Sequence, residues 1–194
     1  MRIPWARIPD GASPYRQDAR PAIYYYHFYI NKTMKFSERM QSAINEQINL
    51  EMFSANTYLS MSTYFAQQGL DGFAHWYYMQ YKEELTHAED MMHYVITRGG
   101  KVEIKAVAAV ETEFNSPLEV AEKAYHHECL VSEKIEGLVR IASEEKDMPS
   151  QDFFWKYIRE QVEEEANATN LIERVRMAKD AAILFLDKEL AARQ

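Results

Sequence analysis

The chain of 194 residues has room for one domain of ordinary size or two small ones, and 47% of its residues are hydrophobic, so a substantial core can be buried. This composition excludes collagen-like, low-complexity and wholly disordered chains. Acidic residues outnumber basic ones by 30 to 22, and no apolar run of about 18 residues indicates a membrane span. Six glycines and six prolines are too few for a strand-rich fold, so we expect long helices.

The cysteine content bears on the compartment. Cys129 is the single cysteine, so no internal disulfide can form. We expect its thiol to be a small buried group, and we expect a reducing compartment and a cytoplasmic protein.

Residues 1–33 differ in composition from the rest of the chain. They contain four of the six prolines and five basic residues against two acidic ones, and they end in an aromatic run, with no regular period. No uninterrupted apolar stretch with a cleavage site indicates a secretory signal. One interpretation is that the segment is disordered or the product of too early a start codon, because Met34 opens a regular pattern. The other interpretation is that it is a basic arm that binds acidic polymers. Without it, the excess of acidic residues rises from 8 to 11 in the remaining domain, residues 34–194.

The first two helices are predicted from their end signals. Ser37 is the predicted N-cap of a helix that runs without Pro or Gly to Gln68, where a glycine follows. Asp71 is predicted to cap a second helix, which runs to Arg98 and stops at two glycines. The connection between the helices is so short that they must be antiparallel neighbours.

A second pair of helices follows a long connection. Residues 100–116 show no helical period, and Ser116-Pro117-Leu118-Glu119 is a capping box with Pro at the first helical position. We expect helix three to run to about Glu145, helix four to run from the break at 147–150 to about Lys179, and a shorter apolar helix at 181–190. The predicted fold is all-α, a four-helix bundle with one long crossover and a short fifth C-terminal helix.

Each long helix carries a stripe of residues, spaced alternately by three and four, that should face the bundle axis. Every stripe includes one glutamate near mid-height, and His87 lies one turn after Glu84. The predicted stripes are Ile44, Ile48, Glu51, Ala55, Tyr58, Ser62 and Phe65; Phe73, Tyr77, Gln80, Glu84, His87, Met91 and Tyr94; Leu118, Ala121, Tyr125, Glu128, Ser132, Ile135, Val139 and Ala142; and Phe154, Tyr157, Gln161, Glu164, Ala168, Leu171, Val175 and Ala178.

Four inward glutamates need an explanation, because a buried carboxylate without compensation is costly. No Lys or Arg lies in any of the four stripes. The glutamates could form a polar network that fixes helix register, or they could hold two divalent cations, whose charges would balance the four carboxylates. Oxygen ligands with one imidazole suit iron or manganese, although zinc could also bind. We therefore predict a two-metal centre.

From Met34 to about Gln194 the chain resembles the ferritin family, specifically the haem-free bacterial ferritins. An inward Glu on each helix with Glu-x-x-His spacing is the known pattern of ferritin-like di-iron bundles. The resemblance rests on Asn49-Leu50-Glu51, Glu83-Glu84-Leu85-Thr86-His87, His127-Glu128 and Glu160-Gln161-Val162-Glu163-Glu164-Glu165.

The resemblance implies the roles of the site residues. It implies that Glu51, Glu84 and His87 bind a first iron. It also implies that Glu128 and Glu164 bind a second iron, with Glu84 bridging the two ions and Gln161 nearby. Tyr58 matches the tyrosine beside the ferroxidase centre, although a purely structural tyrosine would fit the same stripe. An additional inner-surface iron site is implied for Glu83, Glu160 and Glu163 together with Glu164, and the alternative for these residues is a solvated acidic helix face.

Two positions separate the chain from related families. Asn167 lies where bacterioferritins and rubrerythrins place a second histidine, and Leu85 lies where bacterioferritins carry the haem-ligating methionine. We therefore expect no haem, and the lone Cys129 excludes a rubredoxin-like tetrad.

The family resemblance implies a function and an assembly. It implies a ferroxidase that oxidises Fe(II) with O2 or H2O2 and deposits ferric oxyhydroxide inside a homo-oligomeric shell of 24 subunits. The crossover from Val102 to Phe114 would pack against a two-fold neighbour, and the fifth helix would pack near a four-fold axis. We expect no nucleic-acid or membrane partner, because the acidic domain opposes phosphate contact. The alternatives are a DNA-coating ferritin relative, a structural helical protein, or a di-iron redox protein without storage.

Overall fold

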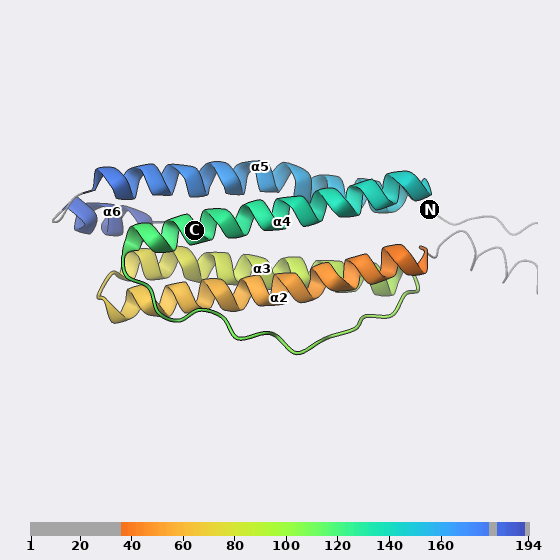
Figure 1. The fold of residues 1–194 in the computed structure, drawn as a ribbon, viewed down its shortest axis with the longest axis horizontal. Coiled ribbons are helices and arrows are strands. Elements are labelled where there is room, and N and C mark those ends of the chain that lie inside the picture. The colour runs from red at the N-terminus through yellow and green to blue at the C-terminus, as the bar shows by residue number, and fades with distance from the viewer. Residues whose placement is uncertain (1–35, 179–181, 193–194) are drawn as a thin grey trace, which may run out of the picture. The chain divides into compact units, whose positions relative to one another are not determined.

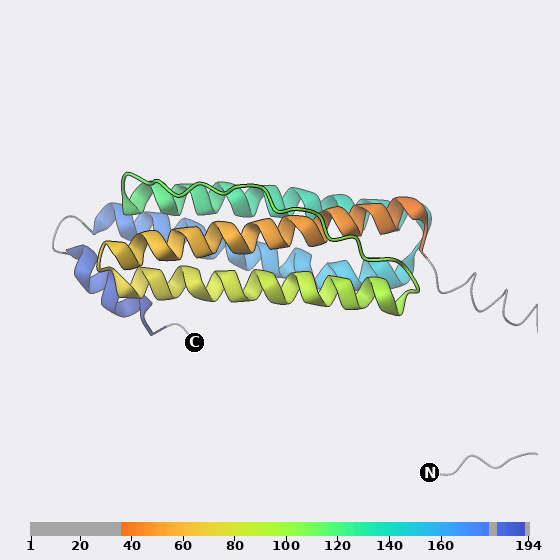
Figure 2. The same ribbon diagram turned by 90° about the horizontal axis from the view of Figure 1, so that it is seen from below.

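The computed structural model describes residues 36–178 and 182–192. These residues form five helices and no strand, and the four long helices lie side by side along one axis (Figures 1 and 2). This arrangement confirms the predicted four-helix bundle with a long crossover and a short C-terminal helix. Residues 1–33, with both interpretations of them, lie outside the described residues. The helices are α2 (Glu38–Gln67), α3 (Asp71–Thr97), α4 (Pro117–Glu145), α5 (Met148–Met177) and α6 (Ala182–Leu190).

The two serine caps that the sequence predicts are both formed. The Ser37 hydroxyl accepts from the Met40 N–H at 2.9 Å, and the Ser116 hydroxyl accepts from the Glu119 N–H at 3.2 Å. The capping box at Ser116 is only half formed, because the Glu119 carboxylate accepts from the Asn115 N–H (2.8 Å). Glu119 therefore fixes the residue before the cap, not the cap itself.

The start of α3 is different and corrects a prediction. Asp71 is the first helical residue, and the N-cap, Leu70, makes no side-chain hydrogen bond. Instead, the Asp187 carboxylate of α6 accepts from the Phe73 N–H at 2.9 Å. Gly72 allows this close packing, because a Cβ at that position would lie 1.6 Å from the Asp187 carbonyl oxygen. The C-terminal helix thus supplies the cap of α3 and packs at its start, as Figure 2 shows.

The crossover between α3 and α4 is held along α2 by amide side chains. Asn45 accepts from the Glu103 N–H (2.7 Å) and donates to the Lys101 carbonyl (2.9 Å). One turn later, Asn49 accepts from the Lys105 N–H (2.7 Å) and donates to the Glu103 carbonyl (2.8 Å). These bonds satisfy an extended backbone that has no secondary structure of its own, and the crossover runs beside α2 in Figure 1 and passes across α2 toward the start of α4 in Figure 2.

The predicted stripe is correct for α2 and half wrong for α4. Every predicted stripe residue of α2 is buried. On α4 four of the eight predicted residues are only partly buried, namely Leu118, Tyr125, Ser132 and Val139, and the neighbouring aliphatic residues are buried instead. The predicted and observed stripes share Ala121, Glu128, Ile135 and Ala142, so spacing alone could not separate them. The observed path on α4 is Ala121, Ala124, Glu128, Val131, Ile135, Leu138 and Ala142.

The core consists of two apolar clusters separated by a polar layer. One cluster contains Phe65 and Phe73 toward the α6 end, and the other contains Ile48 and Phe154 toward the opposite end. The glutamates at mid-height lie between the two clusters along their helices. None of the described helices is both long and apolar enough to cross a membrane.

Candidate metal centre

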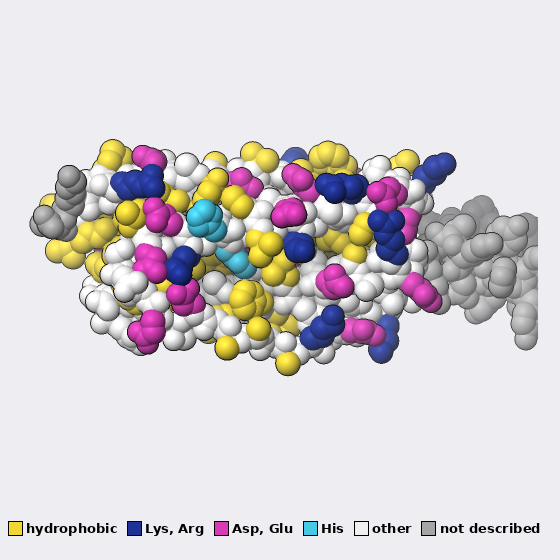
Figure 3. Space-filling view, in the orientation of Figure 1, with side chains coloured by type: hydrophobic (Ala, Val, Ile, Leu, Met, Phe, Trp, Pro, Cys, Tyr) yellow, Lys and Arg dark blue, Asp and Glu magenta, His cyan; other side chains and the backbone are white. Residues whose placement is uncertain are grey.

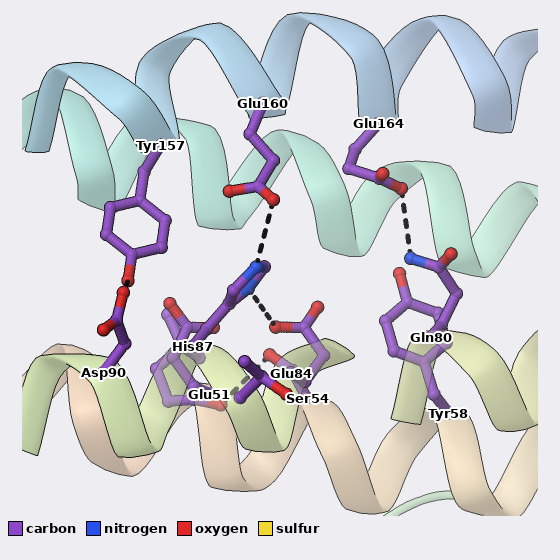
Figure 4. Close-up of polar contacts among 12 residues, drawn as sticks. Glu51, Ser54, Tyr58, Gln80, Glu84, His87, Asp90, Tyr157, Glu160 and Glu164 are labelled. Carbon is purple, nitrogen blue, oxygen red and sulfur yellow. Dashed lines mark hydrogen bonds and ion pairs between the residues drawn. The ribbon is translucent and has the colours of Figure 1, made fainter. Parts of the chain in front are cut away.

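Each of the four long helices places one glutamate in the polar layer. Glu51 of α2, Glu84 of α3 and Glu128 of α4 are buried, whereas Glu164 of α5 is only partly buried. Figure 4 shows Glu51, Glu84 and His87 close together, with Glu164 further along α5. The inward layer predicted from the spacing is therefore present, with its α5 member nearer to solvent.

Glu51, Glu84 and His87 form a compact group of ligand atoms. Each offers one atom, and these atoms lie within 4.8 Å of one another. His87 Nδ1 lies 3.4 Å from Glu84 Oε2, and Gln47 Nε2 donates to Glu51 Oε1 at 2.8 Å. The other Glu51 oxygen, Oε2, is buried and has no hydrogen-bond partner among the described residues. An unpaired buried carboxylate oxygen is costly, and a cation bound by this group would remove that cost.

The electrostatics of this group also favour a cation. Burial, and then the neighbouring Glu84, raise the pKa of Glu51 well above its usual value, and burial raises the pKa of Glu84. Burial also raises the pKa of Glu128 to about 7. Burial alone would lower the pKa of His87, but hydrogen bonds to Glu160 and Glu84 outweigh it and raise the value to about 11. The raised pKa values favour proton binding by these groups in the absence of metal, and a bound cation would displace such protons.

The predicted second pair, Glu128 and Glu164, is not assembled in the same way. The Tyr58 hydroxyl donates to Glu128 Oε1, and Gln161 Nε2 donates to Glu128 Oε2 at 3.0 Å. Gln80 Nε2 donates to Glu164 Oε2 at 3.0 Å. No group of three ligand atoms that includes either glutamate occurs within the described part of the chain. These carboxylates are held by neutral donors and would have to turn to bind a metal.

A further group of possible ligands lies on the other side of His87. Ligand atoms of Glu83, His87 and Glu160 lie within 4.8 Å of one another, and His87 Nε2 is 3.3 Å from Glu160 Oε1. Glu163 lines the same open pocket of about 500 Å³ between α3 and α5. The two nitrogens of one imidazole therefore face two different carboxylate groups. A carboxylate on the second nitrogen of a ligating histidine fixes its tautomer and orientation.

Several polar residues of the site have no role in the sequence-based prediction. Gln47 lies outside the predicted stripe, and Gln80 lies in it without an assigned function. Each is four residues before a predicted ligand, a spacing that places side chains on one helix face. The Tyr157 hydroxyl donates to Asp90 at 3.1 Å, and the Tyr157 ring packs edge-on against His87 with centroids 5.3 Å apart. These contacts hold the ligand side chains in position.

Comparisons with known proteins show what the chain is similar to. The ferritin-like domain model matches residues 41–178. A bacterial non-heme ferritin of Bacteroides fragilis is 48% identical over 157 residues, which cover 81% of this chain and 99% of the relative. A bacterial non-heme ferritin of Staphylococcus aureus is 34% identical and covers 81% and 96% of the two chains. A crystal structure of an open pore ferritin from the hyperthermophilic archaeon Archaeoglobus fulgidus has a TM-score of 0.80 and 46% identity, and covers 82% of this chain and all of that one.

Proposed function

The chain belongs to the ferritin family, and we propose that it stores iron by oxidising Fe(II) and depositing the ferric product as an oxyhydroxide mineral. The buried group of Glu51, Glu84 and His87, with an unpartnered carboxylate oxygen, is the observation that carries this proposal. Fe(II) is the substrate. Oxygen-rich ligation suits iron, and carboxylates favour Fe(III) over Fe(II), so loss of an electron in this site is downhill.

The proposed ferroxidase centre holds two Fe(II) ions. Glu51, Glu84 and His87 bind the first ion, and Glu128 and Glu164 bind the second, with Glu84 between them and Gln161 nearby. Each Fe(II) gives one electron, and O2 or H2O2 accepts the pair. Burial raises the pKa of Tyr58 well above its usual value, so its phenol stays protonated. Tyr58 can then donate a hydrogen bond to Glu128 or supply a further electron.

We propose that the ferric product leaves the centre through the open pocket between α3 and α5. We propose that Glu83, Glu160 and Glu163, with Glu164, hold iron there in transit. This proposal is supported by the ligand group that Glu83 and Glu160 form with His87. His87 Nδ1 faces Glu84 of the buried group, and His87 Nε2 faces Glu160 of the pocket. An ion that moves from the buried group to the pocket would therefore pass the His87 imidazole.

Storage requires a container that one bundle does not provide, and we propose a homo-oligomeric shell of 24 subunits. The apolar side chains Leu184 and Phe185 of α6 are 61% and 78% exposed in the single chain. Exposed apolar groups of this kind favour contact between subunits. We further propose a cytoplasmic protein without haem, since Leu85 lies where a haem-binding relative needs methionine.

The other functional classes are less well supported. Acidic and basic side chains are interspersed on the face in Figure 3, which includes α4 and α5. On this face the basic residues do not gather into the continuous patch that DNA coating would need. The hypothesis that the glutamates only fix helix register predicts no metal binding, so it can be tested directly.

The test compares wild type with Glu84→Gln, and with Glu89→Gln as an exposed control on the same helix. We expect wild type to oxidise Fe(II) rapidly up to two irons per subunit and to deposit further iron in particles of shell size. Glu84→Gln should lose the rapid phase, and Glu89→Gln should keep it. Equal rates in wild type and Glu84→Gln would instead favour the register hypothesis.

A further inference from the structure

A small cavity of about 20 Å³, partly open to solvent beside the exposed Asn167, lies next to the second pair of carboxylates. Its walls include Tyr77 and Gln80 of α3, Glu128 of α4 and Glu164 of α5. About 10–15 Å³ of such volume is enough for one water molecule. The cavity therefore has room for a molecule with one or two oxygen atoms, next to the carboxylates proposed to bind the second iron.

Two of the residues that line the cavity each have one polar atom without a partner within the described residues. Gln80 is 5% exposed and Tyr77 is 1% exposed. The Gln80 carbonyl oxygen and the Tyr77 hydroxyl are both buried without a hydrogen bond. The amide nitrogen of Gln80 is already used by Glu164, and Figure 4 shows its carbonyl oxygen turned away from that carboxylate. Native proteins rarely leave buried polar groups unpaired unless solvent or a ligand satisfies them.

We propose that this cavity binds one small molecule that both accepts and donates a hydrogen bond, either water or hydrogen peroxide, between Tyr77 and Gln80. Burial raises the pKa of Tyr77, so its hydroxyl stays protonated and donates. The Gln80 oxygen can only accept. The occupant must therefore accept from Tyr77 and donate to Gln80. Dioxygen has no hydrogen to donate, and a metal cation cannot accept from a phenol.

Gln80 connects this occupant to the metal site. Its nitrogen holds Glu164 at 3.0 Å, and its oxygen would hold the bound molecule. The identification of peroxide as occupant rests on the proposed ferroxidase function, because peroxide is either the oxidant or the product of O2 reduction there. The binding of water does not rest on that function.

The first test uses Tyr77→Phe, which removes only the unpartnered hydroxyl. If the cavity is occupied, the variant loses a hydrogen bond and the melting temperature of the metal-free protein falls. If the cavity is dry, the variant loses an unpaired buried hydroxyl and the melting temperature stays the same or rises. Tyr64→Phe, near the crossover, is the matched control and should show no change. A high-resolution structure of the metal-free protein should also show density within hydrogen-bond distance of Tyr77 and Gln80.

The second test identifies the occupant from the rate of Fe(II) oxidation at varied H2O2 without O2, and at varied O2. If peroxide binds, Tyr77→Phe raises the half-saturating H2O2 concentration by roughly two- to ten-fold more than it raises the half-saturating O2 concentration. This is the effect of one lost hydrogen bond. If only water binds, the two dependences change together or not at all, while the melting shift and density remain. An empty cavity with no fall in melting temperature overturns the proposal. Failure of wild type to oxidise Fe(II) would overturn the proposed function and leave the solvent test intact.

Discussion

The contact between α6 and the start of α3 predicts a large effect from a single methyl group. In Gly72→Ala the new Cβ would lie 1.6 Å from the Asp187 carbonyl oxygen, whereas ordinary contact begins at 3.4 Å. The atoms in the way belong to the backbone, so no side-chain rotation can relieve the overlap. We expect α6 to leave its position on α3.

The cost can be worked from what α6 buries. Leu186 and Leu190 lose their packing, at about 1.5–3 kcal/mol for each fully buried leucine, and α3 loses the cap that Asp187 gives to Phe73, at about 1 kcal/mol. The ion pair between Arg174 and Glu189 is partly exposed (2.6 Å) and adds little. The expected loss is therefore about 4–7 kcal/mol for docking of α6, and the four long helices should keep their structure.

A matched control is available within the same chain. Gly137 lies inside α4, and a Cβ there meets no atom within 4 Å. Gly137→Ala should therefore stabilise the protein by about 0.5–1 kcal/mol, the usual gain of alanine over glycine in a helix. Hydrogen exchange of 182–190 and size-exclusion chromatography measure the outcome. Gly72→Ala should expose this segment and impair shell assembly, and a protected α6 in an intact shell would refute the packing argument.

Three further predictions concern the polar layer. In the metal-free protein the free energy of unfolding should rise as the pH falls from about 8 to about 5, by about 1.4 kcal/mol per pH unit for each net proton bound. The folded state binds these protons because burial raises the pKa values of the buried glutamates, that of Glu128 to about 7. The glutamates outnumber His127, which acts in the opposite direction because burial lowers its pKa to about 4. In denaturant unfolding, saturating Zn(II) should reverse this dependence of the free energy of unfolding on pH. Gln47→Leu should weaken Co(II) binding at the first metal site, where Gln47 holds Glu51, and Gln80→Leu should weaken it at the second, where Gln80 holds Glu164, each by roughly ten-fold. Loss of the same binding step in both variants would contradict the assignment of these two residues to different sites. Tyr58→Phe should slow Fe(II) oxidation in rapid mixing but leave anaerobic Fe(II) binding intact, so lost binding would show that Tyr58 has a different role.

The helix ends show where local sequence is sufficient and where it is not. Ser37 and Asp71 carry the same kind of capping signal, yet only Ser37 caps its helix. The start of α3 is satisfied by Asp187, more than one hundred residues away. A local pattern contains no information on such a partner, so the prediction fails where tertiary contact replaces the local bond.

The polar layer could be predicted because its members share a spacing on their helices. A glutamate at mid-height in each stripe follows from helical period alone, and so does the proximity of Glu84 and His87. The partners of these residues do not follow from it. Gln47 and Gln80 are ordinary polar residues in sequence, and their contacts depend on the rotation of each helix, which the half-wrong stripe on α4 shows is not fixed by spacing.

The most direct test of the proposed di-iron centre is anomalous scattering at the iron edge from crystals loaded with Fe(II) without oxygen. We expect one iron bound by Glu51, Glu84 and His87 and a second bound by Glu84, Glu128 and Glu164, with these carboxylates turned from their neutral partners. Iron found only at Glu83 and Glu160, or none in the buried layer, would contradict the claim that these glutamates are the ligands of a ferroxidase centre.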